Sequence, residues 1–142
     1  MNEKDLVTFE QAKKLKELGF SYPTAYYYDK YGSVNQKDVD PDYIPDIYVR
    51  YSYIINNKYN TGKYNACDAP FLYQVQNWLR EEKNIHITID TYYPNWVSND
   101  WTLTYECIII YLDKHLRDCL TYRPSTYEEA LSYGINKVLE SL

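Results

Sequence analysis

Apolar positions near the N-terminus recur with helical spacing. They fall three residues apart, at Phe9, Ala12, Leu15 and Leu18. Thr8 precedes this run, and Gln11 lies three residues after Thr8, which is the pattern of a capping box at a helix start. Gly19 predicts the end of the helix, because glycine readily adopts the left-handed conformation that often follows a last turn. The sequence therefore predicts a helix between Thr8 and Gly19.

The pattern then changes to that of β-strands. Residues 25–28 are rich in tyrosine and have strand propensity, residues 29–32 break the run, and residues 33–34 return as the partner strand of a short hairpin. Residues 35–46 have the polar and proline-containing composition of a loop. Residues 47–55 alternate between two faces, which predicts another strand.

A second helix is expected to begin at Asp68 or just before it. Pro70 would lie in the first turn, where its missing N–H costs nothing. The buried stripe of this helix is predicted to consist of Phe71 or Leu72, Val75, Trp78 and Leu79. Asn84 is a suitable residue for a left-handed helix end.

Three strands and a last helix complete the pattern. Residues 85–89 alternate isoleucine with polar residues, residues 103–112 form a long strand, and residues 116–122 pair back across a short turn. The long strand contains three consecutive isoleucines, which indicate burial on both faces and hence a central strand. The last helix opens at Ser125 or Thr126. Its expected buried residues are Ala130, Leu131, Ile135, Val138, Leu139 and Leu142.

These elements predict a single α+β domain over residues 1–142. An antiparallel sheet of four to six strands would carry three helices, and the C-terminal part would have the order α-β-β-β-α. Double-stranded RNA-binding domains share this order of elements. They bind phosphate with basic residues at the start of the last helix, whereas this chain has Glu128 and Glu129 there. RNA binding of that kind is therefore not expected.

Charge narrows the classes of partner further. The chain of 142 residues has a net charge of -5. Residues 1–67 carry nine basic and nine acidic side chains, while residues 68–142 carry six basic and eleven acidic ones. A negative field repels phosphate backbones, so nucleic acid is an unfavoured partner for the C-terminal half.

Hydropathy and cysteine usage predict a location. No apolar run approaches the roughly 18 residues that a membrane span needs, and the N-terminus lacks the apolar core of a secretory signal. We expect a soluble cytoplasmic protein that does not bind membranes. Cys67, Cys107 and Cys119 are odd in number and widely spaced, which predicts reduced thiols that serve as small buried side chains.

One acidic segment partly follows the pattern of a calcium loop. Asp38, Asp40 and Asp42 alternate as the first ligands of such a loop do. Tyr43 and Val49 stand at the positions where the loop needs a glycine and an acidic ligand. The pattern therefore favours a solvated acidic loop over a calcium site.

The histidines and cysteines do not form a recognisable metal pattern either. His115 and Cys119 would lie about 13 Å apart along one face of a strand. His86 and Cys107 could add only a loose cluster, without a CxxC or HxxxH pair. The chain also lacks a nucleophile motif and a glycine-rich phosphate loop. The sequence predicts no metal, no cofactor and no catalytic residue, and thus a protein that is not an enzyme.

Tyrosine is the unusual feature of the composition. The chain has 19 tyrosines, and eleven of them precede residue 67. Tyr26, Tyr27 and Tyr28 are consecutive in the predicted strand, so their rings must fall on both of its faces, and Tyr31 follows in the turn. These four are the candidate binding residues. Three interpretations stay open: ordinary strand side chains, a protein-binding face, or a surface that stacks bases.

Four segments of the chain carry a resemblance to a known group of proteins. They read VTFEQAKKLKELGF, YYYDKYG, APFLYQVQNWLREEKNIHITI and TYEEALSYGINKVLESL. Together they resemble small uncharacterised proteins of phages and mobile elements of gut bacteria; residues 35–65 match least. The resemblance implies an accessory protein that acts inside a bacterial host cell. Together with the tyrosine content, the resemblance predicts a non-catalytic protein that binds another protein or its own copy. The alternative is a nucleotide or single-stranded nucleic-acid binder that uses tyrosine stacking.

Overall fold

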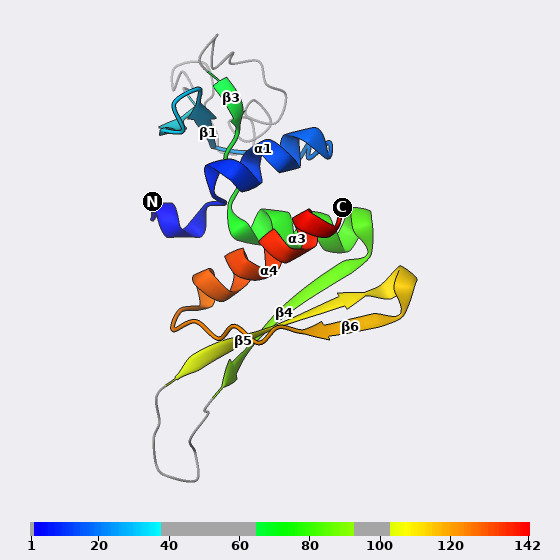
Figure 1. Ribbon diagram of the computed structural model, residues 1–142. Helices are drawn as coiled ribbons and strands as arrows, with labels where there is room; N and C mark the ends of the chain where they lie inside the picture. Colours follow the sequence, from blue (N-terminus) through cyan, green and yellow to red (C-terminus); the bar gives the residue numbers. More distant parts are fainter. Residues whose placement is uncertain (1, 38–64, 93–102) are drawn as a thin grey trace, which may run out of the picture. The chain divides into compact units, whose positions relative to one another are not determined.

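Figure 1 shows the computed structural model of the chain, which describes residues 2–37, 65–92 and 103–142. The chain divides into two compact units. One unit is Leu6–Phe71, and the other consists of Met1–Asp5 and Leu72–Leu142. A single domain over the whole chain stays a prediction.

The first helix of the Leu6–Phe71 unit is formed by the signals that predicted it. Helix α1 spans Phe9–Glu17. The hydroxyl of Thr8 accepts a hydrogen bond from the backbone N–H of Gln11, and the Gln11 side chain accepts one from the N–H of Thr8. Gly19 has a φ of 83°. Its N–H and that of the next residue donate to carbonyls of the last turn, which closes a Schellman motif. The predicted capping box and glycine stop are confirmed.

A three-stranded antiparallel sheet completes this unit. Its strands are β1 Tyr26–Asp29, β2 Val34–Gln36 and β3 Asn65–Asp68, in the spatial order β2-β1-β3. The predicted hairpin is confirmed, although its second strand extends into the segment that was expected to be loop. Helix α1 packs on β3.

The expected start of the second helix is wrong. Asp68 belongs to β3 and pairs with Tyr27, so it is extended. The carbonyl of Pro70 accepts a hydrogen bond from the N–H of Val7 at 3.0 Å, and Phe71 forms an isolated bridge with Leu6. These pairings hold the backbone extended up to Phe71. Proline suits an extended segment as well as a first helical turn, so the sequence signal was ambiguous.

The other unit has the predicted order of elements. Its elements are the short 3-10 helix η1 Glu3–Asp5, α3 Leu72–Lys83, β4 Ile85–Tyr92, β5 Thr104–Tyr111, the 3-10 turn η4 Leu112–Lys114, β6 Leu116–Cys119 and α4 Tyr127–Ser141. The strands form an antiparallel meander in the order β4-β5-β6. The α+β class, the three helices and the C-terminal α-β-β-β-α order are confirmed for the described residues. The six described strands form two sheets of three rather than one sheet.

The core of this unit lies between its sheet and its helices, which occupy the same face of the sheet (Figure 1). Helix α3 packs on β4, and α4 packs on β5 and β4. The inward face of the sheet carries Ile85 and Ile87 of β4 and Cys107, Ile109 and Tyr111 of β5, all buried. The helices contribute Leu72, Val75, Trp78, Leu79, Ala130, Leu131, Ile135, Val138 and Leu139.

Most local expectations for this unit are confirmed. Strand β5 is central, and Asn84 has a φ of 54° at the end of α3. Thr126 caps α4 by accepting a hydrogen bond from the N–H of Glu129 at 3.2 Å. Leu142 was expected to be buried, but it is 42% exposed. It is the C-cap residue of α4 and lies just beyond the last turn.

Two expectations fall on other parts of the chain. The predicted strand over 47–55 and the acidic segment around Asp40 lie outside the described residues. Within the described residues, no helix is both long enough and apolar enough to cross a membrane.

We predict that Gly134→Ala destabilises the protein. This change normally stabilises a helix interior by about 1 kcal/mol. Here an alanine Cβ would overlap the Sγ of Cys107 and lie 3.2 Å from the Cγ2 of Ile87. We expect the free energy of unfolding in urea to fall by about 1–3 kcal/mol.

The matched control for this prediction removes the sulfur. Cys107→Ala should restore part of the stability of Gly134→Ala, which a double-mutant cycle measures as a favourable coupling. A single Gly134→Ala variant that is more stable than the parent would contradict the close approach of α4 to β5.

Candidate interaction site

The tyrosines of the first hairpin divide between core and surface. Tyr28 is buried, its hydroxyl donates a hydrogen bond to the carbonyl of Val7, and its ring centre lies 5.3 Å from that of Phe9. Tyr26 is half-buried, and its ring meets Phe71 edge-on at 5.8 Å. These two predicted site residues therefore pack within the unit.

The other two candidate residues, Tyr27 and Tyr31, are not buried in the core. Tyr27 is half-buried, and alternation along β1 places it on the opposite face from Tyr28. Tyr31 is 79% exposed in the turn, with the Nζ of Lys30 at 5.0 Å from its ring centre. The carboxylate of Asp29 accepts hydrogen bonds from the N–H groups of Ser33 and Tyr31, and these bonds, the first above all, lower its pKa. The turn is ordered by Asp29, and one candidate ring projects from it.

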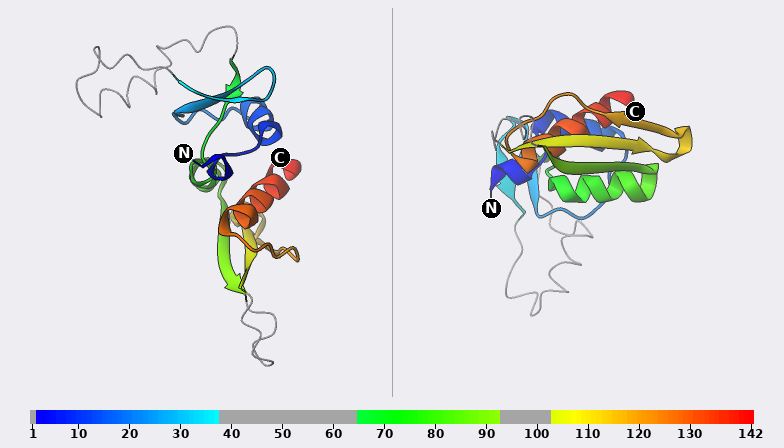
Figure 2. Two further views of the ribbon diagram at one scale, coloured as in Figure 1. Left: turned by 90° about the vertical axis from the view of Figure 1, so that its left-hand side faces the viewer. Right: turned by 90° about the horizontal axis from the view of Figure 1, so that it is seen from below.

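A different feature stands out in the sheet of the other unit, at its two edges. The N–H of Leu112 donates to the carbonyl of Asn84, so these two residues form a hydrogen-bonded pair between the two strands. Such pairs occur at every second residue of an antiparallel ladder. The N–H and C=O groups of His86 and Thr88 therefore point toward β5, and those of Ile87 point outward. The side-chain amide of Gln76 on α3 donates to the outward carbonyl of Ile87 at 2.8 Å. Helix α3 runs alongside β4 in the right-hand view of Figure 2. The β4 edge is therefore covered at Ile87.

The opposite edge, along β6, has no neighbouring strand in the part of the chain that the structure describes. The N–H of Leu120 donates to the carbonyl of Cys107 at 2.9 Å. Alternation then directs the backbone groups of Asp118 toward β5 and those of Arg117 and Cys119 outward. All four residues of β6 have exposed side chains, and no described strand pairs with its outer edge. We call this outer side of residues 116–119 the β6 edge.

Apolar side chains flank the β6 edge. Leu112 in the turn η4 and Leu116, the first residue of β6, are 47% and 50% exposed. Tyr122, three residues beyond the strand, is also exposed. An open edge with adjacent apolar side chains can accept an extended segment of another chain as an additional strand.

Tyr122 is held in place by the beginning of α4. Its hydroxyl donates a hydrogen bond to the carboxylate of Glu129, and this bond is the main cause of the raised pKa of Tyr122. Its ring centre lies 4.8 Å from that of Tyr133. On the same unit Tyr105 and Tyr127 meet edge-on at 6.2 Å. Sequence reasoning concentrated on the N-terminal tyrosines and missed these pairs, because the partners are distant along the chain.

The thiols differ in exposure. Cys67 and Cys107 are buried, as expected, and burial raises the pKa of Cys107 to about 12. The expectation of burial is wrong for Cys119, because it lies on the uncovered strand β6. His115 occupies the preceding turn with a φ of 49°. Among the described residues, no three histidine, cysteine or acidic side chains gather closely enough to hold a metal ion.

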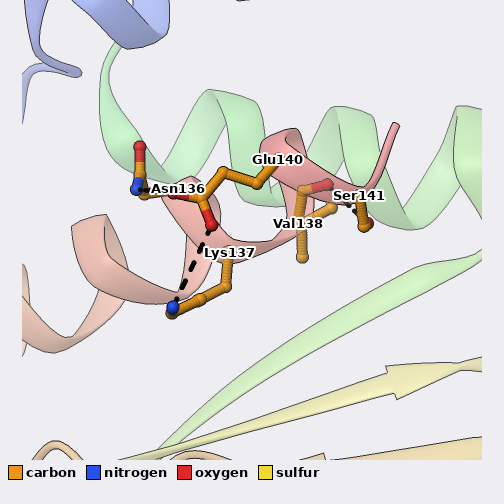
Figure 3. A network of polar contacts seen from close by, with 5 residues as sticks. All are labelled: Asn136, Lys137, Val138, Glu140 and Ser141. Carbon is orange, nitrogen blue, oxygen red and sulfur yellow. Dashed lines mark hydrogen bonds and ion pairs between the residues drawn. The ribbon is translucent and has the colours of Figure 1, made fainter.

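The exposed side of α4 satisfies its own polar groups (Figure 3). The amide of Asn136 donates to the carboxylate of Glu140 at 3.0 Å, and the Nζ of Lys137 lies 3.9 Å from the same carboxylate. The hydroxyl of Ser141 donates to the carbonyl of Val138 at 2.7 Å. Exposed contacts of this kind contribute little to stability, and this side of the helix has the character of an ordinary solvated surface.

The chain was compared with protein-family models, curated proteins and solved structures, and none of them matches it. The candidate site therefore rests on the geometry of the β6 edge and on its chemistry.

We predict opposite outcomes for two of the candidate tyrosines. Tyr28→Phe removes the donor to the buried carbonyl of Val7 and should lower the free energy of unfolding by about 1–2 kcal/mol. Tyr31→Phe removes an exposed hydroxyl and should change it by less than about 0.5 kcal/mol. Urea unfolding measures both. Equal effects of the two substitutions would contradict the assignment of Tyr28 to the core.

Proposed function

We propose that the protein is a non-catalytic accessory protein of a phage or mobile element, and that it acts by binding another protein chain at the β6 edge. The observation that carries the proposal is the difference between the two edges of one sheet. Gln76 covers the β4 edge at Ile87, whereas the outward backbone groups of Arg117 and Cys119 have no partner strand among the described residues and accept no side-chain hydrogen bond from them. Natural sheets often cover an edge with a helix or loop, and no described helix or strand covers this one.

The energetics of strand addition support this mode of binding. Each outward N–H and C=O exchanges a hydrogen bond to water for one to the partner, which gains little by itself. Burial of the exposed part of Leu112 or Leu116 adds roughly 1 kcal/mol for each side chain. The backbone thus fixes the geometry of the added strand, and the flanking apolar side chains contribute affinity.

The proposal contains no catalytic step, since the sequence offers no nucleophile motif, paired carboxylates or phosphate loop. The alternative of base stacking has less support. Tyr28 and Tyr26 pack against Phe9 and Phe71, so the four candidate tyrosines of the described hairpin do not form a continuous exposed platform. The bacterial host follows from the sequence resemblance and the cytoplasmic location from hydropathy and cysteine usage, and both remain part of the proposal.

A proline at position 117 tests the proposal. The N–H of Arg117 points outward, so Arg117→Pro removes no hydrogen bond to β5 but blocks an added strand. The full chain is purified from its bacterium and its bound chains are weighed by native mass spectrometry. We expect the parent to carry a bound protein chain. The bound fraction should be at least about tenfold lower for Arg117→Pro.

Two further variants control for charge and folding. Arg117→Ala keeps the N–H and should retain most of the bound chain. Asp118→Pro removes an N–H that donates to β5 and should unfold the sheet, which shows what general damage looks like. A parent that carries no protein chain, or an Arg117→Pro variant that retains it, would contradict the proposal. Bound nucleotide in place of protein would favour the stacking alternative.

A further inference from the structure

The β6 edge carries two adjacent and opposite charges. Arg117 and Asp118 are both exposed, and neither forms an ion pair with another described residue. Asp118 pairs with Ile109 and so lies on the face of the sheet that carries the helices, while Arg117 pairs with Ile110 and lies on the other face. An added strand therefore meets one positive charge on one face and one negative charge on the other.

On this basis we infer that the β6 edge selects a strand of a different protein with complementary charges, and excludes a second copy of this chain. The added antiparallel strand carries an acidic residue opposite Arg117 and a basic residue opposite Asp118. In its own direction the partner then reads basic followed by acidic. The inference rests on the proposed function and names the chemistry of its partner.

Self-pairing is disfavoured by the same two residues. Two copies of β6 would pair antiparallel about a two-fold axis. In such a dimer the outward backbone groups of Arg117 and Cys119 must bond to the same two residues of the second copy. The numbers of two paired residues then add to an even sum, so the two-fold axis passes through a residue and not between two residues. An axis at Arg117 sets two guanidinium groups opposite each other, and an axis at Asp118 does the same with two carboxylates.

The remaining registers leave too few extended residues to pair. The left-handed conformation of His115 ends the extended segment, so an axis at Leu116 leaves too few residues to pair. An axis at Cys119 sets Asp118 opposite Leu120 and limits the ladder to about three residues. Like charges on edge strands are a recognised protection against self-association. Here they also leave each charge available to a foreign strand.

Two synthetic peptides test the inference on the purified full chain. The first is Thr-Val-Thr-Val-Lys-Glu-Val-Thr-Val-Thr, and the second has the central pair exchanged to Glu-Lys. Fluorescence anisotropy of labelled peptides measures the two dissociation constants at low salt. Two cross-strand pairs change from attraction to repulsion, so we expect the Lys-Glu peptide to bind the parent about fivefold or more tightly. Added salt should reduce this ratio.

The matched control exchanges the charges on the protein. In the double variant Arg117→Asp and Asp118→Arg, the preference should reverse, which a general effect of peptide composition would not produce. Sedimentation velocity of the parent alone should give a monomer. Equal binding of the two peptides, or binding of neither, would overturn the inference.

The outcome is separable from that of the proposed function. A parent dimer that Arg117→Pro dissociates would overturn the exclusion of a second copy, yet it would still support protein binding at the β6 edge. A bound chain from the bacterium that is insensitive to Arg117→Pro would instead contradict the edge as the binding site, whatever the peptides do.

Discussion

The close approach of α4 to the middle strand of the C-terminal sheet decides which parts of that sheet are covered. Gly134 has no side chain, and this lets the helix backbone lie directly over Cys107 and Ile87. With α4 on β5 and β4, and α3 on β4, the apolar faces of both helices are used on two strands. Strand β6 remains exposed on both faces. The open edge is therefore a consequence of how the core is packed.

Coverage of β4 follows from the same packing. Helix α3 connects directly to β4 through Asn84, so it returns alongside the strand that follows it. This position brings Gln76 within hydrogen-bonding distance of the outward carbonyl of Ile87. Strand β6 is followed by α4, but α4 packs on β5 and β4. The two edges of one meander thus differ because a helix precedes one of them.

Local signals predicted much of the fold. The capping box at Thr8 and Gln11, the left-handed Asn84 and the isoleucine alternation of β4 each depend on a few neighbouring residues, and the structure confirms them. The helix start at Asp68 failed because pairing with Tyr27, distant along the chain, decides it. The open edge could not be predicted either: the exposure of Cys119 and the cover provided by Gln76 both depend on helix positions. Composition indicated the tyrosines of the first hairpin as candidate binding residues, whereas Tyr28 is buried in the core.

Amide hydrogen exchange along β6, measured residue by residue by NMR, tests the central claim most directly. In the purified chain the amides of Asp118 and Leu120 should be protected by β5, whereas those of Arg117 and Cys119 should exchange rapidly. In the complex with a bound partner chain, the amides of Arg117 and Cys119 should become protected as well. Slow exchange at Arg117 and Cys119 in the purified monomer, or unchanged rapid exchange in the complex, would contradict the β6 edge as the site of binding.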